Sequence, residues 1–198
     1  CGINPTEGTL RVVYRVAGEG TKEFSEMKAG DTLEVMGPLG NGFTMKNEKA
    51  IIIGGGIGIP PMLELAKQLD AEKTVVLGYR TSTFLKEEFE EVCDVKIATE
   101  DGSQGAKGTV IDAIEKYGVE GKVIYACGPM PMLKALAAYA EEHGMEAQIS
   151  LEERMACGIG ACLGCICKSK TKDHHTNVNN TRICKDGPVF DAKEVVFS

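Results

Sequence analysis

Ala50-Ile-Ile-Ile-Gly-Gly-Gly-Ile-Gly58 is a run of aliphatic residues that passes directly into a cluster of glycines. An apolar run without polar interruption is typical of a strand that is covered on both faces of a parallel sheet. Residues 60–69 follow with proline at the start and apolar residues at helical spacing, which predicts a helix. The order of strand, glycine turn and helix predicts an α/β fold.

The same alternation continues from this stretch to residue 151. Further strands are expected over 74–77, 95–99, 122–126 and 148–151. Further helices are expected over 84–91, 109–117 and 130–143. Strands that alternate with helices are typical of βαβ units. We therefore predict a doubly wound parallel sheet in a domain that spans residues 47–151.

The segment before this domain has a different pattern. Residues 9–17 and 32–36 are rich in β-branched residues and predict two strands, with a turn at 18–21 after the first. Short strands punctuated by glycine and proline are typical of a small antiparallel barrel. So few strands cannot close a barrel, and the chain opens with Cys1 rather than Met. We expect residues 1–46 to be part of a β-barrel whose first strands lie outside this sequence.

Four cysteines dominate the last part of the chain. Cys157, Cys162 and Cys165 have the spacing C-x4-C-x2-C among glycine and alanine, and Cys184 follows. Small residues let the backbone wrap closely around a bound group and direct N–H groups at it. This spacing is the plant-type pattern for a [2Fe–2S] cluster, whereas zinc sites favour separated C-x2-C pairs and disulfides need an oxidising compartment. We predict a cluster module over residues 152–198 with these four thiolates as metal ligands.

Other potential ligands near the cluster are interpreted differently. Cys167 would share a strand face with Cys165, but the cluster spacing ends at Cys165, so Cys167 is interpreted as a neighbour. His174 and His175 lie in a polar, hairpin-like excursion over 169–181 and are interpreted as solvated. The closing residues 194–197 predict one more strand.

The composition limits the classes of partner. The net charge is −7, with acidic and basic residues interspersed, which argues against nucleic-acid binding. No apolar run approaches the roughly 20 residues that span a bilayer, and no secretory signal is visible. Five of the eight cysteines fall between residues 157 and 184, which indicates a local metal site rather than a disulfide framework. We expect a cytoplasmic protein without a nucleic-acid or membrane partner.

Three loops follow predicted strands and should meet at the carboxyl edge of the sheet. Gly54–Gly58 would offer backbone N–H groups to a pyrophosphate, and a strand–helix turn without ligand is the alternative. The Cys127 loop would border a nicotinamide ring, and a buried apolar thiol is the alternative. Asp101 would meet the ribose or adenine, and a solvated loop is the alternative. The candidate nucleotide-binding residues are Gly54, Gly55, Gly56, Ile57, Gly58, Asp101, Cys127, Gly128 and Pro129.

These motifs together resemble a known family. The run from Arg154 to Cys165 and the segment Cys184-Lys-Asp-Gly-Pro-Val-Phe190 are similar to the electron-transfer subunit of the NAD-linked dihydroorotate dehydrogenases. So is Gly37-Pro-Leu-Gly-Asn-Gly-Phe43. The resemblance covers the whole chain and places it among ferredoxin-reductase-like proteins, with a [2Fe–2S] cluster, FAD and NAD as cofactors. The residues that it implies for FAD are Val13, Tyr14, Arg15, Gly20 and Thr21.

The resemblance also implies an activity and a partner. Electrons from the FMN of a dihydroorotate dehydrogenase catalytic subunit would pass through the cluster and FAD to NAD⁺, in pyrimidine biosynthesis. The complex would be a heterotetramer with two copies of each chain, and no residue here would be catalytic toward dihydroorotate. The family's Arg-Pro-x-Ser flavin motif would precede Cys1, so we expect cluster absorption with little bound flavin. The alternatives are a related flavin and iron–sulfur NAD(P)H:ferredoxin oxidoreductase subunit, and a non-enzymatic, metal-stabilised interaction module.

Overall fold

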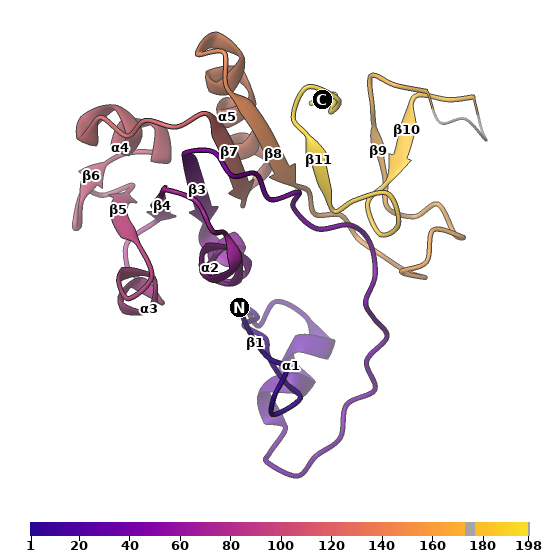
Figure 1. Cartoon of the computed structure of the whole chain (residues 1–198). Coiled ribbons are helices and arrows are strands. Elements are labelled where there is room, and N and C mark those ends of the chain that lie inside the picture. The colour runs from indigo at the N-terminus through magenta and orange to yellow at the C-terminus, as the bar shows by residue number, and fades with distance from the viewer. Residues whose placement is uncertain (173–176, 198) are drawn as a thin grey trace.

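A seven-stranded sheet forms the centre of the computed structural model, which describes residues 1–172 and 177–197 (Figure 1). His174 and His175 lie outside the described residues. The strand order is β11-β8-β7-β3-β4-β5-β6. The parallel strands are β3 (Ala50–Gly55), β4 (Lys73–Tyr79), β5 (Asp94–Thr99), β6 (Ala106–Lys107), β7 (Val123–Cys127) and β8 (Glu146–Ser150). The edge strand β11 (Val189–Asp191) pairs antiparallel to β8, so the predicted α/β fold is confirmed with a mixed sheet.

Helices cover both faces of this sheet (Figure 1). They are α2 (Ile59–Gln68), which follows the short 3₁₀ turn η1 (Gly56–Gly58), α3 (Lys86–Glu90), α4 (Val110–Tyr117) and α5 (Met130–Glu142). Strand β3 shows why two cores form. Ile51 and Ile53 pack with α4 and α5, whereas Ile52 packs with α2 and α3 on the other face. Side chains alternate along a strand, so the continuous aliphatic run supplies both cores.

The N-terminal segment differs from the predicted barrel strands. Strands β1 (Gly2–Asn4) and β2 (Thr9–Arg11) form a two-stranded antiparallel ribbon. The predicted strand over 9–17 stops at Arg11, and residues 32–36 are not a strand in the structure. Both corrections have one cause, because no described strand pairs with these residues and a lone strand has no hydrogen-bonding partner.

The predicted turn at 18–21 is instead the start of a helix, α1 (Glu19–Glu26). Residues 27–40 then run without helix or strand from this helix toward the other end of the molecule, as the violet trace in Figure 1 shows. Among the described residues, no helix is both long and apolar enough to span a membrane.

The C-terminal segment is joined to the sheet rather than separate from it. Strands β9 (Ile166–Lys168) and β10 (Asn180–Arg182) pair antiparallel and flank the expected hairpin-like excursion. The predicted strand over 194–197 is wrong, since Val195 makes one isolated bridge to Ser169. The strand forms at β11 instead, where the edge of β8 supplies a partner.

Candidate nucleotide and cluster sites

Two loops at the carboxyl edge of the sheet lie in direct contact. Strands β3 and β7 are parallel neighbours with Gly54 opposite Cys127, so the loops that follow them start side by side. A Cβ placed on Gly58 would lie 2.4 Å from the carbonyl carbon of Cys127 and 2.6 Å from the nitrogen of Gly128. Real Cβ atoms do not approach backbone this closely, so glycine at residue 58 is required by packing.

Gly56 differs from the other glycines of this loop. Its φ is +54°, and a Cβ built on it would meet no heavy atom within 4 Å. Gly56 and Ile57 are exposed, whereas Gly54, Gly55 and Gly58 are buried. The loop therefore turns its backbone outward at residues 56–57, where a ligand can approach.

The N-terminus of the helix that follows this loop has few N–H groups to offer to an anion. The first turn of α2 contains Pro60 and Pro61, which carry no N–H group. N–H donors for a pyrophosphate at the N-terminus of α2 would therefore come mainly from the loop 54–58. The arrangement fits a dinucleotide through backbone groups of the predicted glycines.

Cys127 ends β7 beside this loop. It is half-buried, and burial raises the pKa of its thiol. Ser150 is its neighbour in register on β8. A groove of about 410 Å³ opens next to it, and its lining residues come from the Cys127 loop, from α5 and from the segment that leads to the cluster cysteines. These residues are Gly128, Pro129, Met130, Leu133, Glu152, Glu153 and Arg154.

Asp101 lies in the loop after β5 and organises that loop. Its Oδ1 accepts hydrogen bonds from the backbone N–H of Ser103 at 3.0 Å and from the Ser103 hydroxyl at 2.7 Å. These two bonds, the backbone one foremost, hold the pKa of the Asp101 carboxyl below its ordinary value. The carboxylate is exposed and ionised at neutral pH, which suits a ribose hydroxyl and disfavours a phosphate.

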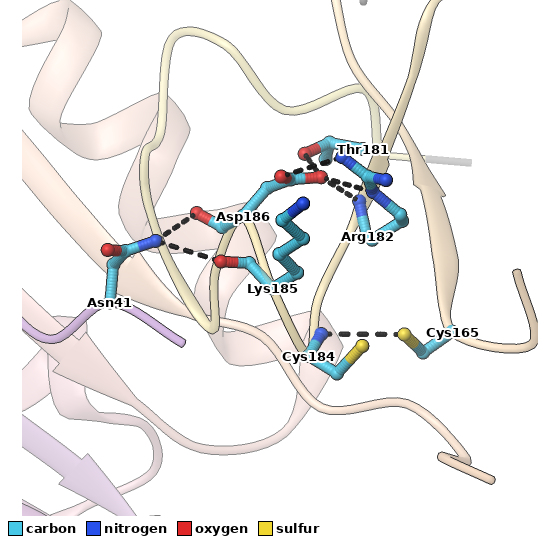
Figure 2. Close-up of polar contacts among 7 residues, drawn as sticks. All are labelled: Asn41, Cys165, Thr181, Arg182, Cys184, Lys185 and Asp186. Carbon is cyan, nitrogen blue, oxygen red and sulfur yellow. Dashed lines mark hydrogen bonds and ion pairs between the residues drawn. The ribbon is translucent and has the colours of Figure 1, made fainter. Parts of the chain in front are cut away.

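The four predicted cluster cysteines lie as two neighbouring pairs. The backbone N–H of Cys162 donates to Cys157 Sγ at 3.4 Å, and the two thiols are adjacent. The backbone N–H of Cys184 donates to Cys165 Sγ at 3.4 Å, and Figure 2 shows both sulfur atoms on the same side of this turn. In the described part of the chain, no three His, Cys, Asp or Glu side chains converge on a single metal position. Two pairs suit a cluster of two irons, each with two thiolates.

Backbone N–H groups surround these sulfur atoms, as expected for a site that holds thiolates. Hydrogen bonds from the N–H groups of Cys162 and then Ile159 lower the pKa of the Cys157 thiol to about 6. Gly164 donates its N–H to Cys162 Sγ at 3.4 Å. The donor set and these N–H groups fit a negatively charged cluster.

Cys167 is the remaining cysteine of this segment. It lies on β9 opposite Thr181 and packs against the same core that contains Cys165 and Cys184. Burial raises the pKa of its thiol to about 11, so it is a neutral, apolar side chain at physiological pH. Cys165 Sγ accepts the backbone N–H of Cys184, and this pairing favours Cys165 over Cys167 as the third ligand.

The residues implied for FAD lie around the start of α1. Tyr14 packs edge-on against Phe24 with ring centroids 5.8 Å apart. Thr21 Oγ1 accepts the N–H groups of Ala17 at 2.8 Å and Gly18 at 3.1 Å, so its hydroxyl caps the helix. Val13 is half-buried, while Tyr14, Arg15 and Gly20 are exposed. Tyr14 and Arg15 thus present side chains that are accessible to a flavin.

The sequence does not single out Asn41, which lies within the Gly37–Phe43 motif. The Asn41 side chain donates to two carbonyl groups next to Cys184, as Figure 2 shows. The signal was a polar residue within a Gly-Pro-rich motif, but its partner lies 144 residues away.

Comparisons with known proteins give two family matches and a set of similar curated proteins. The family described as "Iron-sulfur cluster binding domain of dihydroorotate dehydrogenase B" matches residues 152–196, and "Oxidoreductase NAD-binding domain" matches residues 52–138. The curated protein "Dihydroorotate dehydrogenase B (NAD(+)), electron transfer subunit" of Caldanaerobacter subterraneus subsp. tengcongensis is 48% identical, over 96% of this chain and 77% of its own length. The equivalent protein of Fusobacterium nucleatum subsp. nucleatum is 44% identical, over 98% of this chain and 76% of its own length.

One solved structure is also similar over nearly the whole chain. It is described as the NADH-dependent reduced ferredoxin-NADP oxidoreductase, in a study of flavin-based electron bifurcation. The identity is 34% and the TM-score is 0.86, with 98% of this chain and 71% of that chain covered.

Proposed function

Because the chain belongs to the family of dihydroorotate dehydrogenase B electron transfer subunits, we propose that it carries electrons from a catalytic partner subunit through an iron–sulfur cluster and FAD to NAD⁺. A cluster exchanges single electrons, and a flavin can exchange both single electrons and the hydride that NAD⁺ accepts. The observation that carries the proposal is the groove lined by Gly128-Pro129 and Glu152–Arg154, in which the Cys127 loop lies beside the start of the cluster segment.

The cysteines would hold the cluster in two pairs. Cys157 and Cys162 would bind one iron, and Cys165 and Cys184 the other, with backbone N–H groups stabilising the thiolates. The glycines of 54–58 would hold the pyrophosphate on backbone N–H groups.

Tyr14 and Arg15 would contact the flavin together with Val13, Gly20 and the backbone around Thr21. Cys127 and its loop, which pack against Gly58, would border the nicotinamide. Asp101 would meet the adenosine ribose. The chemistry on dihydroorotate itself would belong to the partner.

The cluster segment would face the partner. Met155, Ile159 and Leu163 flank the cysteines with 51–57% of their surface exposed. Exposed apolar side chains around a redox centre suit a docking surface, and electron transfer requires the partner's centre to come close. We propose that this partner carries FMN and that the complex is a heterotetramer with two copies of each chain, working in the cytoplasm.

Metal and flavin analysis of the purified chain tests the proposal. We expect two irons and two sulfides per chain for a [2Fe–2S] cluster, with NAD(H) binding. The variant Cys184→Ser should lose the visible cluster absorption, whereas Cys167→Ser, its matched control, should keep it. A colourless wild-type protein that contains zinc and no iron would refute the proposal and favour a metal-stabilised interaction module.

A second candidate function is that of a related reductase subunit that serves a ferredoxin. It is favoured by the similarity to the NADH-dependent reduced ferredoxin-NADP oxidoreductase structure. Co-purification separates the two functions. A partner that contains FMN and oxidises dihydroorotate supports the first function, and binding restricted to ferredoxin supports the second.

A further inference from the structure

We propose that Asn41 is a positioning residue for the cluster site, since its side chain fixes the turn that presents Cys184. The inference rests on the proposed cluster function and adds a residue to it that lies outside the cysteine segment. Its basis is a set of contacts between two parts of the chain that are far apart in sequence.

The contacts of Asn41 concentrate on the residues directly after Cys184. Asn41 Nδ2 donates to the carbonyl oxygen of Lys185 at 3.0 Å and to that of Asp186 at 3.2 Å (Figure 2). The backbone N–H of Asn41 donates to the carbonyl oxygen of Gly187 at 2.6 Å. Three consecutive carbonyl groups are therefore bound by a single residue.

The turn that carries Cys184 leaves these carbonyl groups for an outside donor. Its own N–H groups point inward, since those of Lys185, Asp186 and Gly187 all approach the carbonyl oxygen of Arg182. The Asp186 carboxylate closes the turn by accepting from Arg182 Nε at 2.9 Å and Arg182 Nη2 at 3.1 Å. The carbonyl groups face the opposite way, and Asn41 supplies their N–H partners.

The same segment also touches the other cysteine pair. A Cβ on Gly40 would lie 2.3 Å from the carbonyl oxygen of Gly187, so the two segments of the chain are in close contact there. A Cβ on Gly158, the residue after Cys157, would lie 3.2 Å from Leu39 Cδ1. Residues 39–41 thus contact the chain beside the first and the last cysteine and link the two pairs of thiols.

Loss of the Asn41 amide should loosen the Cys184 turn without unfolding the sheet. A net hydrogen bond shifts an equilibrium by about twofold to tenfold, and Asn41 is exposed to competing water. For two bonds we expect about a threefold to thirtyfold faster release of cluster iron.

The test uses chain loaded with iron and sulfide and follows the loss of visible absorbance with an iron chelator. Asn41→Asp keeps the size but removes both donors, Asn41→Ala removes the side chain, and Asn41→Gln restores an amide. Asn47→Asp is the matched control, because Asn47 is exposed and makes no hydrogen bond within the described residues.

We expect Asn41→Asp and Asn41→Ala to release iron faster and to shift the electron paramagnetic resonance of the reduced cluster. Asn41→Gln should restore part of the wild-type rate of iron release. The thermal midpoint of each Asn41 variant should equal that of the Asn47→Asp control. Wild-type release and spectrum in Asn41→Asp would overturn the inference while the proposed function stands. Absence of iron from the wild type would overturn both.

Discussion

The substitution Gly58→Ala tests whether contact between the two nucleotide loops builds the binding edge. The added Cβ would start 2.4 Å from the carbonyl carbon and oxygen of Cys127. An ordinary contact needs about 3.4 Å, so the loops must separate by about 1 Å. Backbone cannot rotate away as a side chain does, and overpacking of this kind costs about 1–3 kcal/mol or more. For a chain of this size, the thermal midpoint should fall by about 2–12 °C.

The assay combines thermal unfolding with NADH titration by fluorescence. Gly58→Ala should lower both the midpoint and the NADH affinity, since the two loops that would flank the pyrophosphate move apart. Gly56→Ala is the comparison variant, because its Cβ would meet no atom and would not push the two loops apart. Its only penalty is the backbone strain of about 1–2 kcal/mol that a φ of +54° imposes on alanine. A Gly58→Ala protein with wild-type midpoint and affinity would refute the packing argument.

Three further substitutions address stability. Tyr125→Phe leaves the N–H of Lys46 without its 2.8 Å acceptor, which should cost about 1–2 kcal/mol and lower the melting midpoint seen by circular dichroism; an unchanged midpoint would contradict this. Burial raises the pKa of the Tyr79 hydroxyl to about 12 from 10.0. The stabilisation that this shift gives to the folded state is therefore complete below pH 10 and is lost as the pH rises toward 12. Tyr79→Phe should reduce the fall in the free energy of unfolding between pH 10 and pH 12, measured by denaturation at a series of pH values. An unchanged fall would show that another group causes it. Thr109→Ala removes the N-cap of α4 and should lower the free energy of unfolding, measured in urea, by about 1 kcal/mol. An unchanged free energy of unfolding would show that the cap does not stabilise the fold.

Local patterns were sufficient to predict the sheet and its edge. The run Ala50–Ile53 is apolar on every residue because the strand has a core on each face. Gly58 is required because the loops that follow β3 and β7 are in direct contact there. The cysteine spacing was equally readable, because three of the thiols are within nine residues of one another.

Features that depend on distant partners were not predictable. Val12 and Val35 have β propensity but are 67% and 77% exposed, since no described strand pairs with them. Residues 194–197 look as strand-like as 189–191, and the free edge of β8 decides between them. The sequence predicts a turn at Thr21, because it does not show that the Thr21 hydroxyl accepts the backbone N–H groups that start a helix.

The antiparallel pairing of β11 with β8 has a consequence for exchanging parts of this protein. Covalent order suggests that the iron–sulfur portion could be cut off near residue 151 and grafted elsewhere. Spatially, the last strand of that portion returns to complete the sheet, with Leu151 N–H bound to the carbonyl oxygen of Pro188 at 2.8 Å. A domain exchange at that residue would remove the strand that pairs with β8 and leave an unpaired sheet edge that is prone to aggregation. The nicotinamide and cluster portions are thus interlaced, and a recombinant swap has to carry both.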